Sequence, residues 1–419
     1  MKSFVLILLL QVVTFAQPTA ISVQKLLNDP RFKVATAFLE ADHSRFVSEL
    51  IELTEIPSPP FKEKVRALAY LEKLRKLGLS DVEMDAEGNV MGLRKGKGTA
   101  PMLAVLAHLD TVFPEGTDVK VKRQGSRLSA PGVGDDTRGL ALLLASIRAL
   151  DAAKFETASD ILFVGNVGEE GEGDLRGVKY LLNKGKYKDK VKQFVSIDGG
   201  EPGPITNAGT GSKRYRVIFT GPGGHSYGAF GLVNPAYAMG NAITKFAKLS
   251  VPEKPKTTFN VGVLSGGTSV NSIPFEVSMD IDMRSESREE LNKLVDAFHG
   301  LLFEAAAEEN KARSTAQGMI KVEAKLIGDR PSGETPKDSL FVQKVAAVVQ
   351  AFGLTPSYTI SSTDSNIPIS LGIPAVTIGR GKGGRQHSLD EWVDVEEKSS
   401  LLAAQVAIAT FLTLAGVPQ

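Results

Sequence analysis

The run of residues 101–110, PMLAVLAHLD, constrains the fold of this chain more than any other stretch. Its apolar residues, 102–107, predict a strand that is buried on both faces. His108 and Asp110 follow two positions apart, so in an extended backbone their side chains project to the same side. A histidine beside a carboxylate is typical of a metal ligand with its orienting partner, but the pattern is weak alone. A metal site here requires further ligands from other segments.

Length and composition exclude several classes of protein. A chain of 419 residues is long for a single core, so two domains are expected. The net charge of +1, from 49 basic and 48 acidic residues, gives no reason to expect a nucleic acid or an anionic membrane as partner. The sequence has no cysteine, which excludes thiolate metal sites, a cysteine nucleophile and a lipid-modified cysteine anchor.

The N-terminus has the pattern of a secretory leader. Met1-Lys2 precedes an almost wholly apolar stretch, residues 4–15, which is followed by Ala16-Gln17. The stretch is shorter than the roughly 20 residues that span a bilayer. We therefore expect a signal peptide at residues 1–16, a periplasmic or secreted protein and no stable membrane anchor. The alternative interpretation is a buried helix.

The remaining chain alternates strands and helices, which predicts an α/β fold with a mostly parallel sheet flanked by helices. Between residues 214 and 327 the order changes to strand–helix–strand–strand–helix–strand, which is that of a ferredoxin-like α+β unit. We therefore predict an inserted domain at residues 212–329. The two parts of the surrounding domain are then residues 17–211 and 330–419.

Ligands in open α/β sheets bind beyond the carboxyl ends of the strands. Five separate segments place polar residues at such positions: His108 and Asp110, Asp135, Glu169 and Glu170, Asp198, and His387. Each has a structural alternative, since Asp135 or Asp136 could cap a helix and the others could occupy solvated turns. Convergence of all five segments favours a single metal site.

The chemistry of this set indicates zinc. Two imidazoles and three carboxylates are too rich in nitrogen for calcium and too few for two closed structural sites. If one carboxylate bridges, each of two metals receives one histidine, one terminal carboxylate and the shared one. Three carboxylates and a hydroxide then balance two Zn²⁺ ions, which together can generate that hydroxide and polarise a carbonyl. One acidic residue of the five segments is then not needed as a ligand and is available for proton transfer.

Five motifs, in this order and spacing, resemble the M-twenty family of cocatalytic zinc metallopeptidases. They are HLD at 108–110, GVGDD at 132–136, GEEG at 168–171, GGHS at 223–226 and QHSLDE at 386–391. The family includes peptidase T-like aminotripeptidases, carboxypeptidase G-like enzymes, aminoacylases and succinyl-diaminopimelate desuccinylases. The resemblance extends over residues 31–414. It implies a zinc-peptidase-like sheet, two Zn²⁺ ions with Co²⁺ or Mn²⁺ as possible substitutes, and a homodimer formed through the inserted domain.

The resemblance also implies a role for each metal ligand. His108 and His387 match ligands of different metals, and Asp135 matches the carboxylate that bridges them. Glu170 matches the terminal ligand on the His387 metal, and Asp198 matches that on the His108 metal. The family's usual Asp-x-Lys-Gly appears here as residues 135–139, DDTRG, which still favours Asp135 as the bridge.

The remaining roles implied by the resemblance concern catalysis and substrate. Glu169 matches the general base, and Asp110 matches the acid that orients the imidazole next to it. His225 matches a histidine that stabilises the tetrahedral oxyanion, often from the partner subunit. Asn271 and Arg284 match positions that anchor substrate, and the guanidinium fork of Arg284 suits a carboxylate.

Aspartate at position 198 favours an exported aminopeptidase or dipeptidase that acts on small peptides, because deacylases and carboxypeptidases of the family tend to have glutamate there. An amidohydrolase of N-acyl amino acids, or a carboxypeptidase, is the alternative within the family. A non-catalytic binding protein with this fold is a further alternative. It would be expected to have lost a ligand or the base, and the sequence retains all of them.

Overall fold

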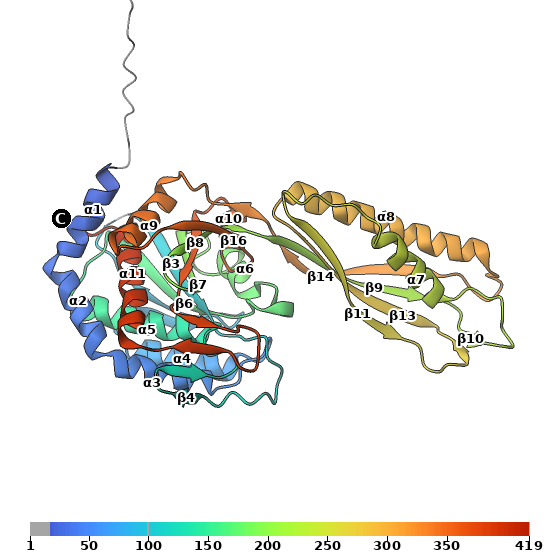
Figure 1. The fold of residues 1–419 in the computed structure, drawn as a ribbon, viewed down its shortest axis with the longest axis horizontal. Helices are drawn as coiled ribbons and strands as arrows, with labels where there is room; N and C mark the ends of the chain where they lie inside the picture. The colour runs from blue at the N-terminus through green and yellow to red at the C-terminus, as the bar shows by residue number, and fades with distance from the viewer. Residues whose placement is uncertain (1–16, 99, 419) are drawn as a thin grey trace, which may run out of the picture.

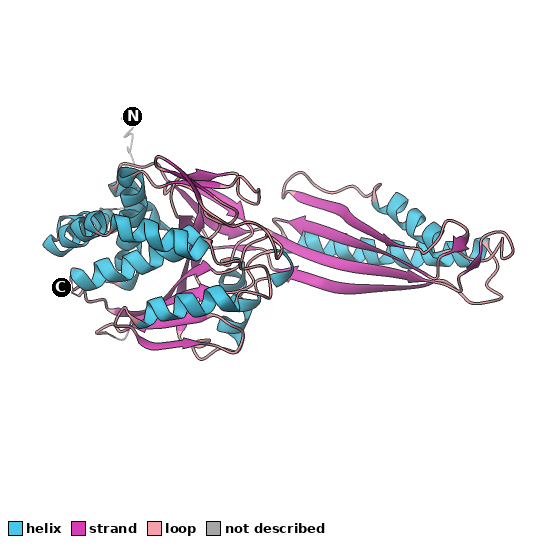
Figure 2. Cartoon of the chain, turned by 90° about the horizontal axis from the view of Figure 1, so that it is seen from below, coloured by secondary structure: helices cyan, strands magenta, loops and turns pink. Residues whose placement is uncertain are grey.

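The computed structural model describes residues 17–98 and 100–418, and the predicted leader at 1–16 lies outside them. The chain forms two lobes, a larger one that contains both termini of the described chain and a narrower one that extends away from it (Figure 1). A mixed sheet forms the centre of the larger lobe, with helices on both of its faces (Figure 2). The predicted fold class, an α/β sheet with an inserted α+β unit, is confirmed.

The central sheet has the strand order β1-β2-β6-β3-β7-β17-β8-β15, and β16 also pairs with β8. The strands are β1 Ser80–Met84, β2 Val90–Arg94, β3 Ala100–His108, β6 Ser159–Asn166, β7 Val191–Gly199, β8 Pro204–Gly209, β15 Gly333–Glu334, β16 Ser357–Ser361 and β17 Ala375–Gly379. β6, β3, β7 and β17 are neighbours and parallel, so their carboxyl ends meet at one edge. That edge carries the loops predicted to hold ligands.

β3 is buried on both faces, as its apolar run predicts. Leu103, Val105 and Ala107 belong to the core beneath the larger helical layer, whereas Met102, Ala104 and Leu106 pack into the core on the other face. The helices of the larger layer are α1 Gln17–Asn28, α2 Pro30–Ala41, α3 His43–Thr54, α4 Lys64–Arg75, α5 Thr137–Ala152, α9 Leu340–Ala351 and α11 Glu397–Ala415. α6 Arg176–Asn183 and α10 Asn366–Ser370 cover the opposite face, and η1 Gly171–Gly173 is a single 3₁₀ turn.

α11 is the single helix of the described chain that is long and apolar enough to cross a membrane. It contacts α9, β3 and α5, and most of its residues are buried. Its apolar character is therefore that of a core helix. The chain also forms a separate four-stranded sheet of order β18-β19-β5-β4, with β18 Gly383–Gly384, β19 Trp392–Asp394, β5 Arg127–Ser129 and β4 Lys122–Gln124.

The narrow lobe is an antiparallel sheet of order β11-β13-β9-β14 that packs against two helices. Its elements are β9 Gly211–Thr220, β10 Gly224–His225, α7 Pro235–Phe246, β11 Thr257–Gly266, β12 Ser272–Ile273, β13 Glu276–Ser285, α8 Arg288–Ala312 and β14 Lys321–Arg330. Along β13 every second side chain is buried, including Val277, Met279 and Ile281, so one face of the sheet meets the helices.

Residues 30–54 form two helices, α2 and α3, with Asp42 between them. The Asp42 carboxylate accepts a hydrogen bond of 2.8 Å from Nε of Arg148 on α5. This contact between residues distant in sequence fixes the break, which helical periodicity alone does not reveal.

Candidate metal centre

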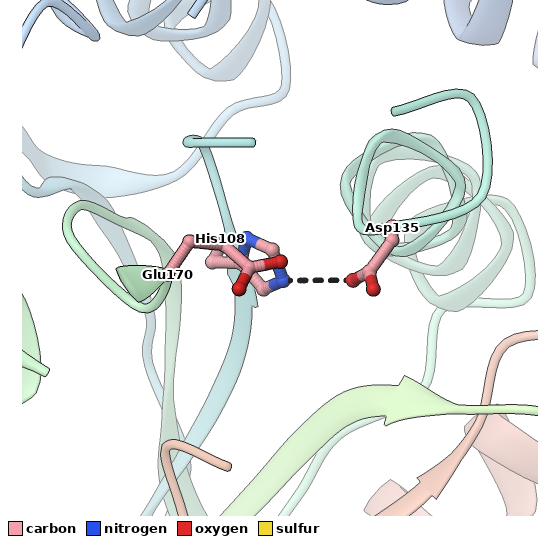
Figure 3. Close-up of side chains that lie close together, drawn as sticks. All are labelled: His108, Asp135 and Glu170. Carbon is pink, nitrogen blue, oxygen red and sulfur yellow. Dashed lines mark hydrogen bonds and ion pairs between the residues drawn. The ribbon is translucent and has the colours of Figure 1, made fainter. Parts of the chain in front are cut away.

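His108 ends β3 and is almost completely buried. Its Nδ1 lies 3.0 Å from the carbonyl oxygen of Asp110, which can only accept, so Nδ1 carries the proton. Nε2 faces Asp135 Oδ1 at 3.1 Å (Figure 3). With Nδ1 held by the carbonyl oxygen, Nε2 is the nitrogen that a metal would bind.

Asp135 lies between two imidazoles. While its Oδ1 faces His108, its Oδ2 lies 3.3 Å from Nε2 of His387. The loop before it is held by the buried Glu391 carboxylate, which accepts the backbone N–H groups of Gly132, Gly134 and Asp135 at 2.7–3.0 Å. Asp135 is thus the shared carboxylate of the cluster, in the position that its motif implies.

Each imidazole also has a carboxylate of its own. His387 Nε2 lies 3.0 Å from Glu170 Oε1, and His108 Nε2 lies 3.8 Å from Asp198 Oδ1. His387 adopts a φ of 62°, a conformation that is uncommon for residues other than glycine and concentrates at functional sites. The five predicted ligands therefore converge: His108 and Asp198 from the ends of β3 and β7, Glu170 and His387 from loops, and Asp135 from the loop before α5.

The donor set fits a divalent metal. Two groups of donor atoms, His108–Asp135–Glu170 and His108–Asp136–Asp198, each lie within 4.8 Å of one another, and His387 Nε2 contacts Asp135 and Glu170. This mixture of carboxylates and imidazoles suits Zn²⁺, Co²⁺ or Mn²⁺. Hydrogen bonds to Asp135 and Glu170 raise the pKa of His387 to about 10, and Asp135 and Asp198 outweigh burial to raise that of His108 well above its usual value. The carboxylates thus favour the protonated form of both imidazoles when no metal is bound. A metal ion would displace these protons.

Glu169 lies beside the cluster and is held by Arg330 at the end of β14. Nη1 of Arg330 is 3.2 Å from Glu169 Oε1, and Nη2 donates to the Glu169 carbonyl oxygen. Burial is the main cause that raises the pKa of Glu169 well above its usual range, and the Glu170 charge adds to it, while Arg330 opposes it. A carboxyl group with a raised pKa holds a proton more readily, as a group that takes up a proton and passes it on must do.

The side chain and the backbone of Asp110 have different roles. Its carboxylate accepts the backbone N–H groups of Glu169 and Glu170, at 3.0 and 2.7 Å, and lies 3.7 Å from Nδ1 of His108. The motif implies that this carboxylate orients the imidazole. In the structure the carbonyl oxygen makes the closer contact with the imidazole, and the carboxylate positions the pair of glutamates.

Two further buried residues contact the cluster and were missed by sequence reasoning. Asp136 occupies the N-cap position of α5, but its carboxylate accepts the backbone N–H of His108 at 3.1 Å instead of capping the helix. Arg380, directly after β17, places its guanidinium against Asp135, Asp136 and Asp198. A position just past a buried strand was the available signal for Arg380.

The cluster opens into a cavity of about 540 Å³ between the lobes. Arg284 of β13 and Arg214 of β9 line it, and both pair with Asp282, through Nε atoms at 2.7 and 3.0 Å from its oxygens. One carboxylate thus neutralises one of two guanidinium groups. The structure brings Arg284 to the site, where its remaining N–H groups can meet a substrate carboxylate.

His225 and Asn271 lie elsewhere. β10, which contains His225, is at the far end of the narrow lobe from β3 (Figure 1). The exposed His225 Nδ1 accepts backbone N–H groups of Tyr227 and Gly228, and Asn271 accepts the backbone N–H of Ser226. Within one chain, neither residue lines the cavity of the metal cluster.

Replacing Arg330 by glutamine is expected to shift the acidic limb of the kcat/KM profile to higher pH. A base works when deprotonated, so activity falls as pH drops through its pKa. The Arg330 charge lowers the pKa of Glu169, and its removal therefore raises that pKa. Hydrolysis rates measured between pH 5 and 9 test this, with Arg330→Lys as the charge-preserving control. If the acidic limb stayed at the same pH in Arg330→Gln, it would not report the ionisation of Glu169.

Comparison with known proteins gives a consistent assignment. The model of peptidase family M20/M25/M40 matches residues 104–413. Carboxypeptidase G2 of Pseudomonas sp. (strain RS-16) is 24% identical over 345 residues, which are 78% of this chain and 79% of that protein. The crystal structure of aminopeptidase PepT from Bacillus cereus ATCC 10987 superposes with a TM-score of 0.71 at 24% identity, covering 89% of this chain and 99% of the other. A Bacillus subtilis protein described as a dinuclear metal-binding peptidase gives 0.65 at 17% identity, with coverages of 90% and 99%.

Proposed function

The chain belongs to peptidase family M20/M25/M40, whose members hydrolyse peptide or amide bonds, and on this premise we propose that it is an exported di-zinc aminopeptidase or dipeptidase. The observation that carries the proposal is the Asp135 carboxylate, which faces His108 on one side and His387 on the other, with Glu169 beside it. The resemblance stated from the motifs is confirmed at the level of the family.

Each residue of the site has its own role in the proposed hydrolysis. When bound, two Zn²⁺ ions supply a hydroxide nucleophile at neutral pH and polarise the carbonyl of the scissile bond. Glu169 accepts a proton and passes it to the leaving amine, and Arg330 holds its carboxylate in place. Asp110 fixes both glutamates through their backbone N–H groups.

Small peptides are supported as substrates by the shape and charge of the cavity. Its volume of about 540 Å³ is in the range of sites for small molecules. Arg284 and Arg214 present one uncompensated positive charge, which suits the C-terminal carboxylate of a dipeptide or tripeptide. Asp198, which aminopeptidases of the family favour, and the likeness to aminopeptidase PepT support the same substrate class.

The alternative is hydrolysis of N-acyl amino acids or carboxypeptidase activity, which the likeness to carboxypeptidase G2 supports. Such substrates also carry a carboxylate that the Arg284 fork could hold. The two proposals differ in the other end of the substrate, which is a free amine in the first and a blocked nitrogen in the second.

We further propose a homodimer formed through the narrow lobe. His225 and Asn271 lie at the end of that lobe, remote from the cluster of their own chain (Figure 1). A second copy could bring them to its neighbour's cavity, where an imidazole would stabilise the oxyanion. Export rests on the leader pattern at residues 1–16.

A side-by-side assay tests the substrate class. Free-amine dipeptides and tripeptides are compared with N-blocked amino acids of the same side chains, using zinc-loaded protein. We expect kcat/KM to be higher for the free-amine set, because the proposed site is that of an aminopeptidase or dipeptidase. Activity confined to the blocked set would replace the proposal with its alternative.

A further inference from the structure

Arg380 is a buried cation built into the metal centre. It is 4% exposed, and its backbone N–H donates to the carbonyl oxygen of Gly199 at 3.2 Å, which joins the ends of β17 and β7. Its Nη1 contacts the Asp198 carboxylate and lies 3.3 Å from Asp136 Oδ1, and its Nη2 lies 3.4 Å from Asp135 Oδ1. Burying a guanidinium is costly unless anions surround it, so this arrangement is a specific feature of the site.

The guanidinium makes the two halves of the cluster unequal. Oδ1 of Asp135 faces both His108 and Arg380, whereas Oδ2 faces His387. Asp198, the carboxylate near His108, is also in contact with Arg380. Glu170, the carboxylate near His387, makes no ion pair with any lysine or arginine of the described residues. Among the described residues, the guanidinium that contacts ligand carboxylates therefore lies on the His108 half, against Asp198 and Asp135 Oδ1.

The overall charge still allows two divalent ions. The ligand carboxylates Asp135, Glu170 and Asp198, together with a hydroxide, balance two Zn²⁺ ions. The structure adds one negative charge at Asp136 and one positive charge at Arg380, so the overall charge is unchanged and loading of two ions is not prevented. The Asp136 carboxylate already accepts the backbone N–H of His108, whereas Arg380 contacts the Asp135 and Asp198 oxygens that the second ion would use and competes for them directly.

We propose that Arg380 is a positioning residue that makes metal loading sequential. The first ion binds tightly between His387, Glu170 and Asp135. The second binds more weakly between His108, Asp198 and Asp135, because the guanidinium competes for the same oxygens and repels the ion. The inference rests on the proposed metallopeptidase function. It adds that the two ions bind in a fixed order and with different affinities.

Zinc titration of the metal-free full-length protein, in competition with a chromophoric chelator, tests the inference. We expect two phases for the wild type, with Kd values at least about 100-fold apart. Arg380→Gln should strengthen the second phase at least about 10-fold and leave the first within about 3-fold. Arg385→Gln is the matched control: Arg385 lies in the same loop, is exposed and pairs with Asp390, so both phases should be unchanged.

Two histidine variants assign the phases while Arg380 is retained, and they test the inference even if Arg380→Gln does not fold. His108→Ala should keep the tight phase, and His387→Ala should lose it. The reverse assignment would overturn the inference, as would equal affinities in the wild type or an unchanged or weakened second phase in Arg380→Gln. Absence of both phases would contradict the proposed metallopeptidase as well, whereas two equal phases would contradict the inference alone.

Discussion

Replacing Glu169 by alanine is expected to lower kcat by about 10²–10⁴-fold, the usual contribution of a general acid–base, and to leave the metal content near that of the wild type. The carboxylate pairs with Arg330 and is not part of the set that surrounds the two imidazoles. Proton transfer to the leaving amine would lose its donor, while the ligands would remain. Turnover of a dipeptide and metal analysis of the same sample provide the measurement.

Two further variants make this result specific. Glu169→Gln keeps the size of the side chain and removes its charge, so it should be as inactive as the alanine variant. Glu172→Ala removes an exposed glutamate of the adjacent 3₁₀ turn and should keep wild-type turnover. Near-normal activity of Glu169→Ala would exclude its role in proton transfer, and loss of metal would make it a ligand instead.

Most of the cluster could be predicted from the sequence because of how parallel sheets are built. A strand covered on both faces is a continuous apolar run, and a polar residue directly after it lies at the edge where ligands bind. His108 after β3, Glu169 and Glu170 after β6, and Asp198 at the end of β7 follow this rule. Their identification needs no knowledge of the strand order.

Arg380 could not be recognised as part of the cluster in the same way. Its importance depends on β17 lying beside β7, which places it against Asp198, 182 positions earlier in the chain. Strand order is set by tertiary packing and is not written in local periodicity. Its position directly after β17, which Arg385 does not share, indicates the edge where ligands bind but not the contact with Asp198.

The position of His225 could not be predicted from the sequence for a different reason. Its motif implies a catalytic role, but the length and direction of the narrow lobe place it far from the cluster of the same chain (Figure 1).

β8 was also not predicted, because the segment PITNAG begins with proline, ends with glycine and has no apolar run. Its pairing with β16 and β17 creates the strand where local propensity is poor.

Replacing Asp135 by asparagine is expected to reduce bound metal from two ions per chain to one or none and to abolish detectable hydrolysis. Asparagine has nearly the same shape, but its amide nitrogen cannot ligate and its negative charge is gone. The carboxylate faces both His108 and His387, so both positions lose a ligand at once. Loss of even a residue that supports a ligand typically costs about 10–100-fold in affinity, and loss of a shared ligand should cost more.

Two comparisons isolate the shared role of Asp135. Asp198→Asn removes a carboxylate that faces His108 and not His387, so this variant should lose one metal and keep the ion at His387. Asp189→Asn, at an exposed acid between α6 and β7, should keep the full metal content. Metal analysis after gel filtration, together with a thermal melt to confirm folding, distinguishes the three variants. If Asp135→Asn retained two tightly bound metals, Asp135 would not be the bridge, and the paired arrangement of His108 and His387 would need another shared ligand.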